Sequence, residues 1–552
     1  MASEPSVTTT KSNGTVVPHV TIIRPVKGIE PYLYECIAAA CHQDYPREKL
    51  SIYLCVASKR DPAIPILEQL VCDFPTWDVR IFIGDDDPAL FESVGAPPCL
   101  GPNPKIRNIS RAYREAKGDI VWILDCNVWV NSGVCGRMVD RLTGRSPDGP
   151  KRPYKFVHQL PICVEVDWQQ AKQQTYGIHQ SEMTTEDAVV RNACPQKPTS
   201  LSWQGGRLEG LFLSSSHAKF YTAINTVAVA PCIVGKSNMF RRSHLNYLTS
   251  TPRDQKSNTS SFASVPDVGL GVDYFSHNIC EDHLIGDLLW RGEIPFAPKD
   301  IGNHALLYGD LAIQPISDLS ITGYIARRVR WLRVRKFTVP VATFVEPGTE
   351  SFLCSAYLAW ALTALDWFRE RVPFSVSSPW TTFAALWLAS VCLWSVVDWN
   401  VYLLLHSGRT IPARSDSETS QQEKADGKNN NNHLYLRDDD HIPSFVRPSN
   451  NIQKSRRHFF SWLFAWMGRE TLALPIWIWA IWGGVTVAWK DQKYWVGMDM
   501  RVHQLSDSAK KEGKKGKETI SEDVENKGKR RRVTKTPMIN GYHVNEAKTH
   551  KD

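Results

Sequence analysis

Three uncharged apolar runs in the second half of the chain constrain its fold more than any other feature. They cover residues 351–365, 381–397 and 471–489. A membrane-spanning helix needs about 17 to 25 apolar residues. The second and third runs are long enough to span a bilayer, and the shorter first run is expected to lie along the interface. Of the 20 tryptophans, 12 fall between Trp360 and Trp489. Tryptophan is typical of membrane–water boundaries, which disfavours the alternative of buried core helices.

The overall composition is that of a globular chain. Among 552 residues, 42% are hydrophobic and 22% are charged, which excludes a wholly disordered or collagen-like protein. The formal net charge of +8 is modest, so it does not indicate a nucleic-acid partner, and none is expected. Thirteen cysteines without a CxxC pair disfavour a structural zinc site and suit a reduced, cytosol-facing protein.

The first part of the chain, residues 18–130, alternates between strand-like and helix-like segments. Short apolar runs rich in β-branched residues recur at 20–26, 50–57, 78–84 and 119–130. Strands that alternate with helices favour a parallel sheet of βαβ units, and an antiparallel α+β arrangement is the alternative. Residues 131–350 are less regular and are expected to form the second half of one domain spanning 18–350.

The remaining boundaries follow shifts in composition. Residues 1–17 are polar and hold no apolar stretch of signal-peptide length, so we expect membrane attachment through later segments. The divisions expected after residue 350 are membrane or interfacial helices at 351–406, a disordered polar insert at 407–457, a membrane helix at 458–490, and a basic, disordered tail at 491–552. KRRR at 529–532 is typical of a solvated tail or of one that contacts anionic lipid.

Two acidic residues follow strand-like runs and are candidates for ligand binding. Asp61 comes after LSIYLCVASKR, and Asp125 comes directly after VWIL. Ligands of open α/β sheets bind beyond the carboxyl ends of the strands. Asp61 could therefore accept hydrogen bonds from a nucleotide base or ribose, and Asp125 could hold a divalent cation beside a diphosphate. Taken singly, either residue could instead be a turn residue or a helix cap.

A third acidic residue and a basic cluster lie further along the chain. Asp282 belongs to CEDHLIGDLLWRG, in which an acidic pair opens a helix-like stretch. Such a pair can cap a helix, or Asp282 can take the proton of an attacking hydroxyl as a general base. In RRVRW, Arg327 and Arg330 are three residues apart and would share a helix face suited to diphosphate oxygens. Trp331 could stack on a sugar ring or on lipid.

One apparent phosphate-binding motif fails on its own spacing. VGKS at 234–237 resembles the end of a phosphate loop, but Ala230 stands where that loop requires glycine. No GxGxxG motif follows the first strand-like run. The motif therefore does not support nucleotide-triphosphatase chemistry.

Taken together, these elements resemble the membrane glycosyltransferases that carry three aspartates and a (Q/R)xxRW motif. The similarity is strongest to the ceramide glucosyltransferase family, including its fungal members, and extends over residues 18–345. It is carried by segments such as VTIIRPVKGIEPYLYECIAAACHQDYP, SIYLCVASKRDPAIP, GPNPKIRNI, SSSHAKFYTAIN, CIVGKSNMFRR, EDHLIGDLLWRG and RRVRW. A weaker similarity covers 468–482.

The resemblance implies a GT-A type catalytic domain in an integral membrane protein of the Golgi or endoplasmic reticulum, facing the cytosol. It implies transfer of glucose from UDP-glucose to the primary hydroxyl of ceramide, with inversion to the β-anomer. By motif, Asp282 would be the catalytic base. Donor-binding residues would be Asp61, Lys105, Asp125, Arg327 and Arg330, and acceptor-binding residues would be His217 and Trp331. Asp125 would also serve a divalent cation, Mg²⁺ or Mn²⁺.

Two features depart from the family pattern. Relatives begin with a membrane anchor, whereas this sequence begins with polar residues. The strand-end motif reads Asp125-Cys126-Asn127, and its single carboxylate weakens the case for a metal. An alternative function is a processive polysaccharide synthase of the chitin or cellulose type, although those enzymes usually show Gln at the position of Arg327 and more spans. A non-enzymatic membrane adaptor is a third reading, which the intact acidic and basic motifs disfavour.

Overall fold

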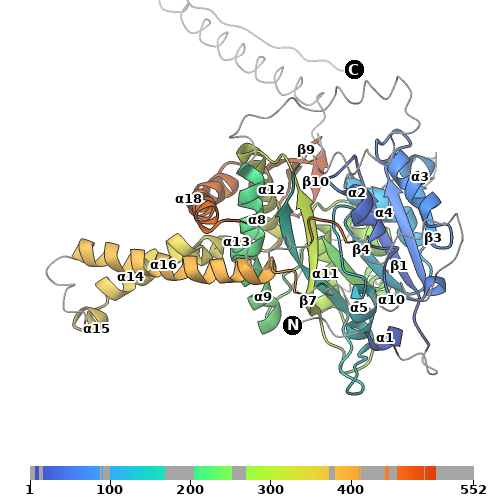
Figure 1. Cartoon of the computed structure of the whole chain (residues 1–552), viewed down its shortest axis with the longest axis horizontal. Coiled ribbons are helices and arrows are strands. Elements are labelled where there is room, and N and C mark those ends of the chain that lie inside the picture. Colours follow the sequence, from blue (N-terminus) through green and yellow to red (C-terminus); the bar gives the residue numbers. More distant parts are fainter. Residues whose placement is uncertain are drawn as a thin grey trace, which may run out of the picture.

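The computed structural model of the chain contains an α/β domain and a group of long C-terminal helices (Figure 1). It describes residues 6–10, 16–87, 90, 100–167, 204–250, 269–371, 379–409, 411, 442–446, 457–489 and 492–504. The α/β domain is built on one seven-stranded sheet with helices on both faces. This confirms the predicted α/β class, followed by apolar C-terminal helices.

The first four strands form a parallel sheet, as the alternation of strands and helices predicts. They are β1 (Val20–Val26), β2 (Leu50–Val56), β3 (Asp78–Ile83) and β4 (Ile120–Leu124). Strand β1 pairs in parallel with β2 and β4, and β2 pairs in parallel with β3. Strands β2 and β4 are buried at every position, because a parallel sheet is covered by helices on both faces.

Three later strands extend this sheet rather than forming a separate one. They are β5 (Phe156–Glu165), β6 (Ser237–Arg241) and β7 (Ala305–Ile316), and the strand order is β3-β2-β1-β4-β6-β5-β7. Strand β6 runs antiparallel to both neighbours, and β5 pairs in parallel with β7. All strands except β6 therefore end at the same edge of the sheet. The 18–130 and 131–350 segments share one sheet, so the expected halves are not structurally separate.

Helices cover the two faces of the sheet with separate apolar cores. The helices of this domain are α2 (Leu33–Ala38), α3 (Ile64–Asp73), α4 (Pro104–Arg114), α5 (Val134–Thr143), α8 (Gln204–Ser214), α9 (Ser216–Val227), α10 (Arg242–Ser250), α11 (Glu281–Arg291), α12 (Ile321–Thr338) and α13 (Pro340–Val345). Ile22 lies in the core with α2, α3 and α5, whereas Ile23 lies in the core with α4, α10 and α11. Successive strand side chains point to opposite faces, so each strand supplies both cores.

The C-terminal helices differ in how much of their apolar surface is covered. They are α14 (Ser351–Ala364), α15 (Asp366–Arg369), α16 (Pro379–Leu405) and α18 (Phe459–Trp482). Helices α14 and α16 lie side by side and project away from the α/β domain, whereas α18 packs against α8 and α12 (Figure 1). Of the helices that the structure describes, α16 alone is long and apolar enough to cross a membrane. This is weak evidence for membrane association.

The expected membrane helix at 458–490 is only partly right. The helix ends at Trp482, and Gly484 then adopts a φ of +112°. Residues Thr486–Trp489 form strand β8, which pairs with β9 (Gln492–Val496), and β9 pairs with β10 (Val502–Gln504). The glycine pair stops the helix, since glycine tolerates a conformation that other residues avoid, and the β-branched residues that follow favour a strand.

Parts of the expected disordered insert, of the expected disordered tail and of the polar N-terminal segment pack onto the α/β domain. The backbone N–H of Val502 donates to the His277 carbonyl over 2.8 Å, so a disordered tail beginning at residue 491 is wrong for residues 492–504. Phe445 and Val446, inside the expected insert, are buried in the core, because apolar side chains gain by leaving water. In the polar N-terminal segment, α1 (Val7–Thr10) is held by the Asp140 carboxylate. The rest of the insert and tail lies largely outside the described residues.

Candidate active site

The edge at which the parallel strands end brings together residues far apart in the sequence. Asp125 follows the last residue of β4, and Ser237 pairs with Leu124 at the start of antiparallel β6. The next position along this ladder places Lys236 opposite Asp125, and the Asp125 backbone N–H donates to the Lys236 carbonyl over 3.1 Å. The sheet topology therefore positions a lysine beside the strand-end aspartate.

Lys105 joins the two predicted carboxylates. Its Nζ lies 3.3 Å from Asp125 Oδ1 and 3.0 Å from Asp282 Oδ1. It also lies 3.4 Å from Glu281 Oε1. We call Lys105, Asp125, Glu281 and Asp282 the lysine cluster. The prediction that Asp125 and Asp282 share one site is therefore supported by the geometry.

Helix capping explains how Lys105 is positioned. Asn103 caps α4, accepting hydrogen bonds from the backbone N–H groups of Lys105 and Ile106, and Pro104 occupies the first turn, where its missing N–H costs nothing. The Asn103 side chain also donates to Glu281 Oε2 over 2.9 Å. One asparagine thus holds the first turns of α4 and α11 together, and with them the ammonium and the carboxylates.

The charges in the cluster reinforce one another. Burial alone would raise the pKa of Asp125, but the neighbouring Lys105 and Lys236 outweigh it and hold that pKa at about 2. Burial opposes the charge of Lys105 as well, yet the Asp125, Asp282 and Glu281 carboxylates raise its pKa well above the usual value. Both groups are therefore charged at neutral pH, because each supplies the opposite charge within reach of the other.

The Asp282 carboxylate lies directly against Gly235, where there is no room for a Cβ atom. A Cβ atom at position 235 would lie 1.8 Å from Asp282 Oδ2, which is far inside any permitted contact. Gly235 thus lets the loop before β6 approach the start of α11. Glu281 is the residue next to Asp282. Burial, and to a smaller extent the charge of Asp282, raises the pKa of Glu281 to about 8. Asp282 is the more exposed of the two adjacent acids, at 20% against 3%.

The Asp61 carboxylate binds backbone N–H groups of residues that follow β1 and β2. Its carboxylate accepts hydrogen bonds from the Gly28 N–H over 3.0 Å and from the Ala63 N–H over 2.9 Å. Gly28 has a φ of +68°, a conformation in which glycine is favoured. These contacts are those of a turn residue, the alternative that the sequence left open. Asp61 lies at the ligand edge, and its carboxylate bonds to the Gly28 and Ala63 backbone rather than to the lysine cluster.

The two predicted arginines of α12 differ in their partners. Arg327 Nε lies 2.9 Å from Oε1 of Glu209, a fully buried residue of α8. Arg330 has no hydrogen bond or ion pair in the described part of the chain. Burial, and then the charge of Arg327, lower the pKa of Arg330 to about 10. A cation that is buried beside another cation favours an anionic ligand. The charge of Asp125 also acts on Arg327, so the arginines adjoin the lysine cluster.

The predicted acceptor residues lie among aromatic side chains. The His217 ring on α9 is 5.4 Å from the Phe212 ring and 5.3 Å from the Tyr221 ring. Burial, and then the charges of Arg328 and Arg335, lower the pKa of His217 to about 3, so the imidazole is neutral. Trp331 packs 6.4 Å from Phe212. The structure brings His217 and Trp331 near each other through Phe212, but neither contacts the lysine cluster.

Two residues that the sequence did not single out support this site. Lys236 Nζ lies 2.9 Å from Asp125 Oδ2 and 3.4 Å from Asn127 Oδ1. Arg24, fully buried in β1, donates from Nη2 to the carbonyls of Asp125, Cys126 and Val128 at 2.9, 3.1 and 2.9 Å. The signals were present: an arginine interrupts the apolar run VTIIRPV, and Lys236 belongs to the rejected VGKS motif.

The residues at Asp125 do not fit a divalent cation as they stand. Each oxygen of its only carboxylate faces an ammonium, Lys105 at 3.3 Å and Lys236 at 2.9 Å. The described residues contain no group of three His, Cys, Asp or Glu side chains arranged to hold a metal. Hard cations need several oxygen ligands. Asp125, as it is paired here, is therefore not assigned a divalent cation in the reaction.

A cavity of about 690 Å³ opens at the same edge, beyond the end of β5. It is lined by residues from β5, α8, α16 and the start of α18, among them Cys163, Arg207, Tyr402 and Arg457. Burial raises the pKa of the Cys163 thiol, and the charges of Glu209, Arg327 and Lys236 also act on this group. The cavity therefore adjoins the cationic group of the site.

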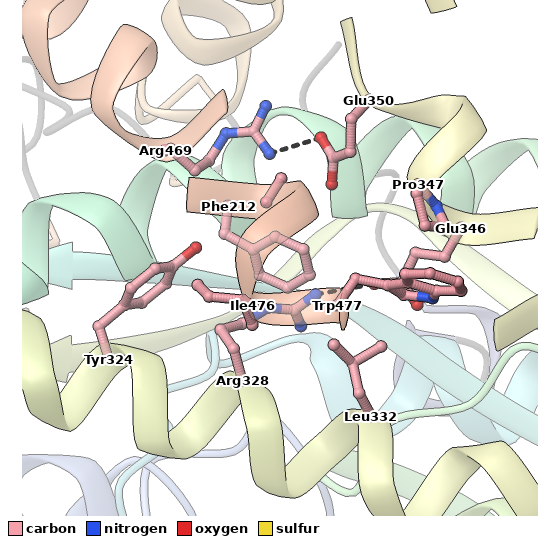
Figure 2. A pocket seen from close by; sticks show the side chains of 11 residues that line it. Phe212, Tyr324, Arg328, Leu332, Glu346, Pro347, Glu350, Arg469, Ile476 and Trp477 are labelled. Carbon is pink, nitrogen blue, oxygen red and sulfur yellow. Dashed lines mark hydrogen bonds and ion pairs between the residues drawn. The ribbon is translucent and has the colours of Figure 1, made fainter. Parts of the chain in front are cut away.

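A second buried cluster lies between α12, α18 and the start of α14, and Figure 2 shows two of its side chains, Arg469 and Glu350. Arg469 Nη1 donates to Glu350 Oε2 over 2.7 Å and also pairs with Glu470. We call Arg469, Glu350 and Glu470 the arginine cluster. The adjoining cavity is only about 20 Å³, room for about one water molecule. This cluster joins α18 to the rest of the molecule.

Comparisons with known proteins agree with this geometry. The sequence model described as glycosyl transferase family 21 matches residues 2–176 and 267–412. A ceramide glucosyltransferase of Pyricularia oryzae is 47% identical over 90% of this chain and 87% of that protein. One from Gibberella zeae is 43% identical over 89% of this chain and 86% of that protein. One from Candida albicans is 30% identical over 88% of each.

Among solved structures, a mannosyltransferase of Pyrobaculum calidifontis covers 72% of this chain and 89% of its own, with 16% identity and a TM-score of 0.30. That similarity is too low to carry an argument. The sequence matches are sufficient, since the family model covers more than half of the chain and three relatives align over most of both lengths. The chain belongs to glycosyl transferase family 21, together with fungal proteins named ceramide glucosyltransferases.

Proposed function

We propose that this chain transfers glucose from UDP-glucose to the primary hydroxyl of ceramide, with inversion at the anomeric carbon. Family membership and the names of the relatives support the substrates. The observation that carries the proposal is the meeting of Asp125 and Asp282 at the Lys105 ammonium. A glycosyl transfer needs a base on one side of the sugar and a site for the departing diphosphate on the other, and this edge offers both.

The chemistry requires a single displacement. The ceramide oxygen bonds to the anomeric carbon as the bond from that carbon to the β-phosphate oxygen breaks, and the electron pair of the broken bond leaves with UDP. Asp282 takes the proton of the ceramide hydroxyl. General base catalysis of this kind contributes about 10²–10⁴ in rate. A covalent sugar–enzyme intermediate is not required, so no second carboxylate acts as a nucleophile.

Basic residues at the edge bind the donor. Arg330 forms no ion pair in the described part of the chain, and the charge of Arg327 disfavours its own charge more than that of Glu209 favours it, so a diphosphate would relieve both burial and repulsion. Asp61 accepts a hydrogen bond from the Gly28 N–H and so fixes the backbone on the uridine side of the donor site. The Lys105 ammonium pairs with both Asp282 oxygens at 3.0 and 3.2 Å. The donor diphosphate competes for that ammonium, which frees the base when the donor is bound.

The acceptor reaches the site from the lipid side. Helices α14 and α16 expose large apolar side chains, including Trp360, Trp380 and Leu388, which suit burial in a bilayer. At the base of this hairpin, the buried Asp398 of α16 pairs with Lys219 of α9 at 2.5 Å. The 690 Å³ cavity is lined by residues of β5, α8, α16 and the start of α18, so ceramide could present its headgroup there while its tails stay in lipid.

Attachment through this hairpin agrees with an enzyme whose catalytic domain faces the cytosol at the Golgi or endoplasmic reticulum. UDP-glucose, the proposed donor, is soluble, whereas ceramide is confined to the bilayer. An enzyme that uses both substrates needs a water-exposed binding edge and a lipid-contacting surface in the same molecule. Lipid contacts and topology are part of this proposal.

The test is a donor and acceptor matrix on the full-length chain in lipid nanodiscs. We expect labelled glucose to pass from UDP-glucose to ceramide, giving a product that a β-glucosidase cleaves. A ladder of products of increasing length would instead indicate a polysaccharide synthase. The absence of any lipid-linked product from all donors and acceptors would overturn the proposed transfer.

A further inference from the structure

We propose that Lys236 is a donor-binding residue, and that with Lys105 it forms a two-lysine site that neutralises the diphosphate in place of a divalent cation. The inference rests on the proposed function and names the groups that carry out one part of it. Lys236 lies in VGKS, a segment whose spacing does not fit a phosphate loop, and the sequence alone assigns no role to it. The ligand it would bind is the diphosphate of a nucleoside diphosphate sugar.

The backbone fixes Lys236 at the ligand edge. The antiparallel pairing of β4 and β6 aligns Leu124 with Ser237, and the hydrogen bond from Asp125 N–H to Lys236 carbonyl continues that ladder. Lys236 therefore cannot move away from the strand-end aspartate without breaking the sheet. Its side chain is 12% exposed, as is that of Lys105, so both ammonium groups are largely shielded from water yet open at one side.

The two lysines differ in their free hydrogen-bonding capacity. An ammonium group donates three hydrogen bonds. Lys105 Nζ is already surrounded by Asp125, Glu281 and Asp282, and the Gly235 carbonyl lies 3.5 Å away. Lys236 Nζ contacts only Asp125 Oδ2 and Asn127 Oδ1 in the described part of the chain. One N–H of Lys236 is therefore available for a phosphate oxygen without any existing contact being broken.

The local charge balance also favours an anion. Four cations converge on this edge: Lys105, Lys236, Arg327 and Arg330. The facing carboxylates include Asp125, Asp282, Glu209 and Glu281, and the charge of Glu30 also acts on Arg327. The raised pKa of Glu281 favours its neutral form, and the loss of that negative charge shifts the local balance toward binding an anion.

These positions explain how the leaving group is stabilised without a metal. As the bond between the anomeric carbon and the β-phosphate oxygen breaks, the electron pair passes to UDP, and the two ammonium groups donate to its phosphate oxygens. The ceramide proton goes to Asp282. Preorganised cations of this kind stabilise charge that develops in the transition state, because they need little rearrangement.

The alternative is that Lys236 only balances the charge of Asp125. The two roles separate in a binding measurement that compares UDP with uridine, since uridine lacks the phosphates. The variants are Lys236→Met, which removes the charge, and Lys236→Arg, which keeps it. Lys151→Met removes an exposed lysine paired with Asp148 and serves as the control. Each full-length variant is assayed in nanodiscs by equilibrium binding, with EDTA or with Mn²⁺, and its thermal unfolding is recorded.

We expect the wild-type chain to bind UDP equally well in EDTA and in Mn²⁺. Lys236→Met should lose at least about tenfold in UDP affinity, since hydrogen bonds to charged groups contribute about 1.5–3 kcal/mol, while its uridine affinity stays within about twofold of wild type. Lys236→Arg should retain most of the UDP affinity, and Lys151→Met should match wild type.

Other outcomes overturn the inference in distinguishable ways. Wild-type UDP binding that is lost in EDTA and restored by Mn²⁺ shows that a metal holds the diphosphate. Equal loss of UDP and uridine affinity in Lys236→Met shows a structural role, as does unchanged UDP affinity with lowered thermal stability. A wild-type chain that does not bind UDP rejects the donor in the proposed function and this inference with it. UDP binding that follows the expected pattern without transfer to ceramide rejects the acceptor alone.

Discussion

The lysine cluster and the arginine cluster have similar composition but opposite surroundings. In the lysine cluster, Lys105, Asp125 and Asp282 are 12%, 22% and 20% exposed. In the arginine cluster, Arg469, Glu350 and Glu470 are 1%, 9% and 0% exposed. The first lies at the ends of parallel strands beside a large cavity, and the second is sealed between helices. Access to water, rather than the kinds of residues, separates a site that can bind a ligand from one that can only hold helices together.

The largest expected effect is on catalysis in the lysine cluster. Asp282→Asn should lower kcat by about 10²–10⁴, because the amide cannot accept the hydroxyl proton. UDP-glucose affinity and thermal stability should change little. The measurement is single-turnover transfer to ceramide, with donor binding assayed in parallel. Asp287→Asn on the same helix, where Asp287 pairs with the exposed Arg291, is the matched control and should keep wild-type turnover. Near wild-type turnover of Asp282→Asn would remove Asp282 as the base.

The arginine cluster should show the reverse pattern. Arg469→Met leaves Glu350 and Glu470 buried without their cation, and loss of one partner of a buried pair costs about 3–5 kcal/mol. We expect a lower free energy of unfolding in detergent, measured with urea, and unchanged KM for UDP-glucose in the fraction that remains folded.

A triple variant sharpens this second test. Adding Glu350→Gln and Glu470→Gln to Arg469→Met removes the uncompensated charges and should restore most of the lost stability. If Arg469→Met alone is as stable as wild type, the arginine cluster does not hold α18 in place.

A smaller effect is expected at Arg330, which has no partner in the described part of the chain. Arg330→Ala should weaken UDP binding by about tenfold or more, since charged hydrogen bonds contribute about 1.5–3 kcal/mol. Because no existing ion pair is lost, stability should not fall. Isothermal titration with UDP measures the affinity, and Arg371→Ala, an exposed arginine beside Trp367, is the control. Unchanged UDP affinity would show that Arg330 belongs with the structural arginines.

The smallest expected effect concerns the pH dependence of stability. The pKa of Glu281 is raised in the folded state by burial and by Asp282, so folding favours its neutral form. Stability from this group is present below its ordinary pKa of 4.5 and is lost as pH rises through about 8. Glu281→Gln should therefore gain stability relative to wild type as pH rises across that window, because the amide has no proton to lose there. Thermal unfolding near both ends of the window tests this, and parallel curves would contradict the raised pKa.

The alternation of strands and helices was enough to predict the parallel strands, and the family resemblance was enough to expect Asp125 and Asp282 in one site. Local patterns sufficed there because buried parallel strands require continuous β-branched runs, and the ends of such strands converge by geometry. Asp61 shows the limit of this reasoning. It lies at the predicted edge, yet its carboxylate accepts hydrogen bonds from the Gly28 and Ala63 backbone, and the Gly28 contact comes from the end of the adjacent strand β1.

The helical runs show a second limit. Residues 381–397 and 471–489 are alike in composition, yet α16 projects from the domain while α18 packs against α8 and α12. The difference comes from Arg469 and Glu470, which lie just before the second run and find Glu350 far away in the sequence. An apolar run therefore indicates a helix, but whether lipid or protein covers it depends on charges that only folding brings together.

Residue order alone was sufficient for the α/β class, the strand-end position of Asp125 and the family, because each depends on short patterns read along the chain. Folding brought Lys236 to the site, placed Lys105 between two carboxylates, and paired Thr486–Trp489, Gln492–Val496 and Val502–Gln504 into a small sheet. The physical reason is distance. An ion pair or a strand partner forms between groups that may be more than 100 positions apart, and no local pattern specifies the field that each such group will experience.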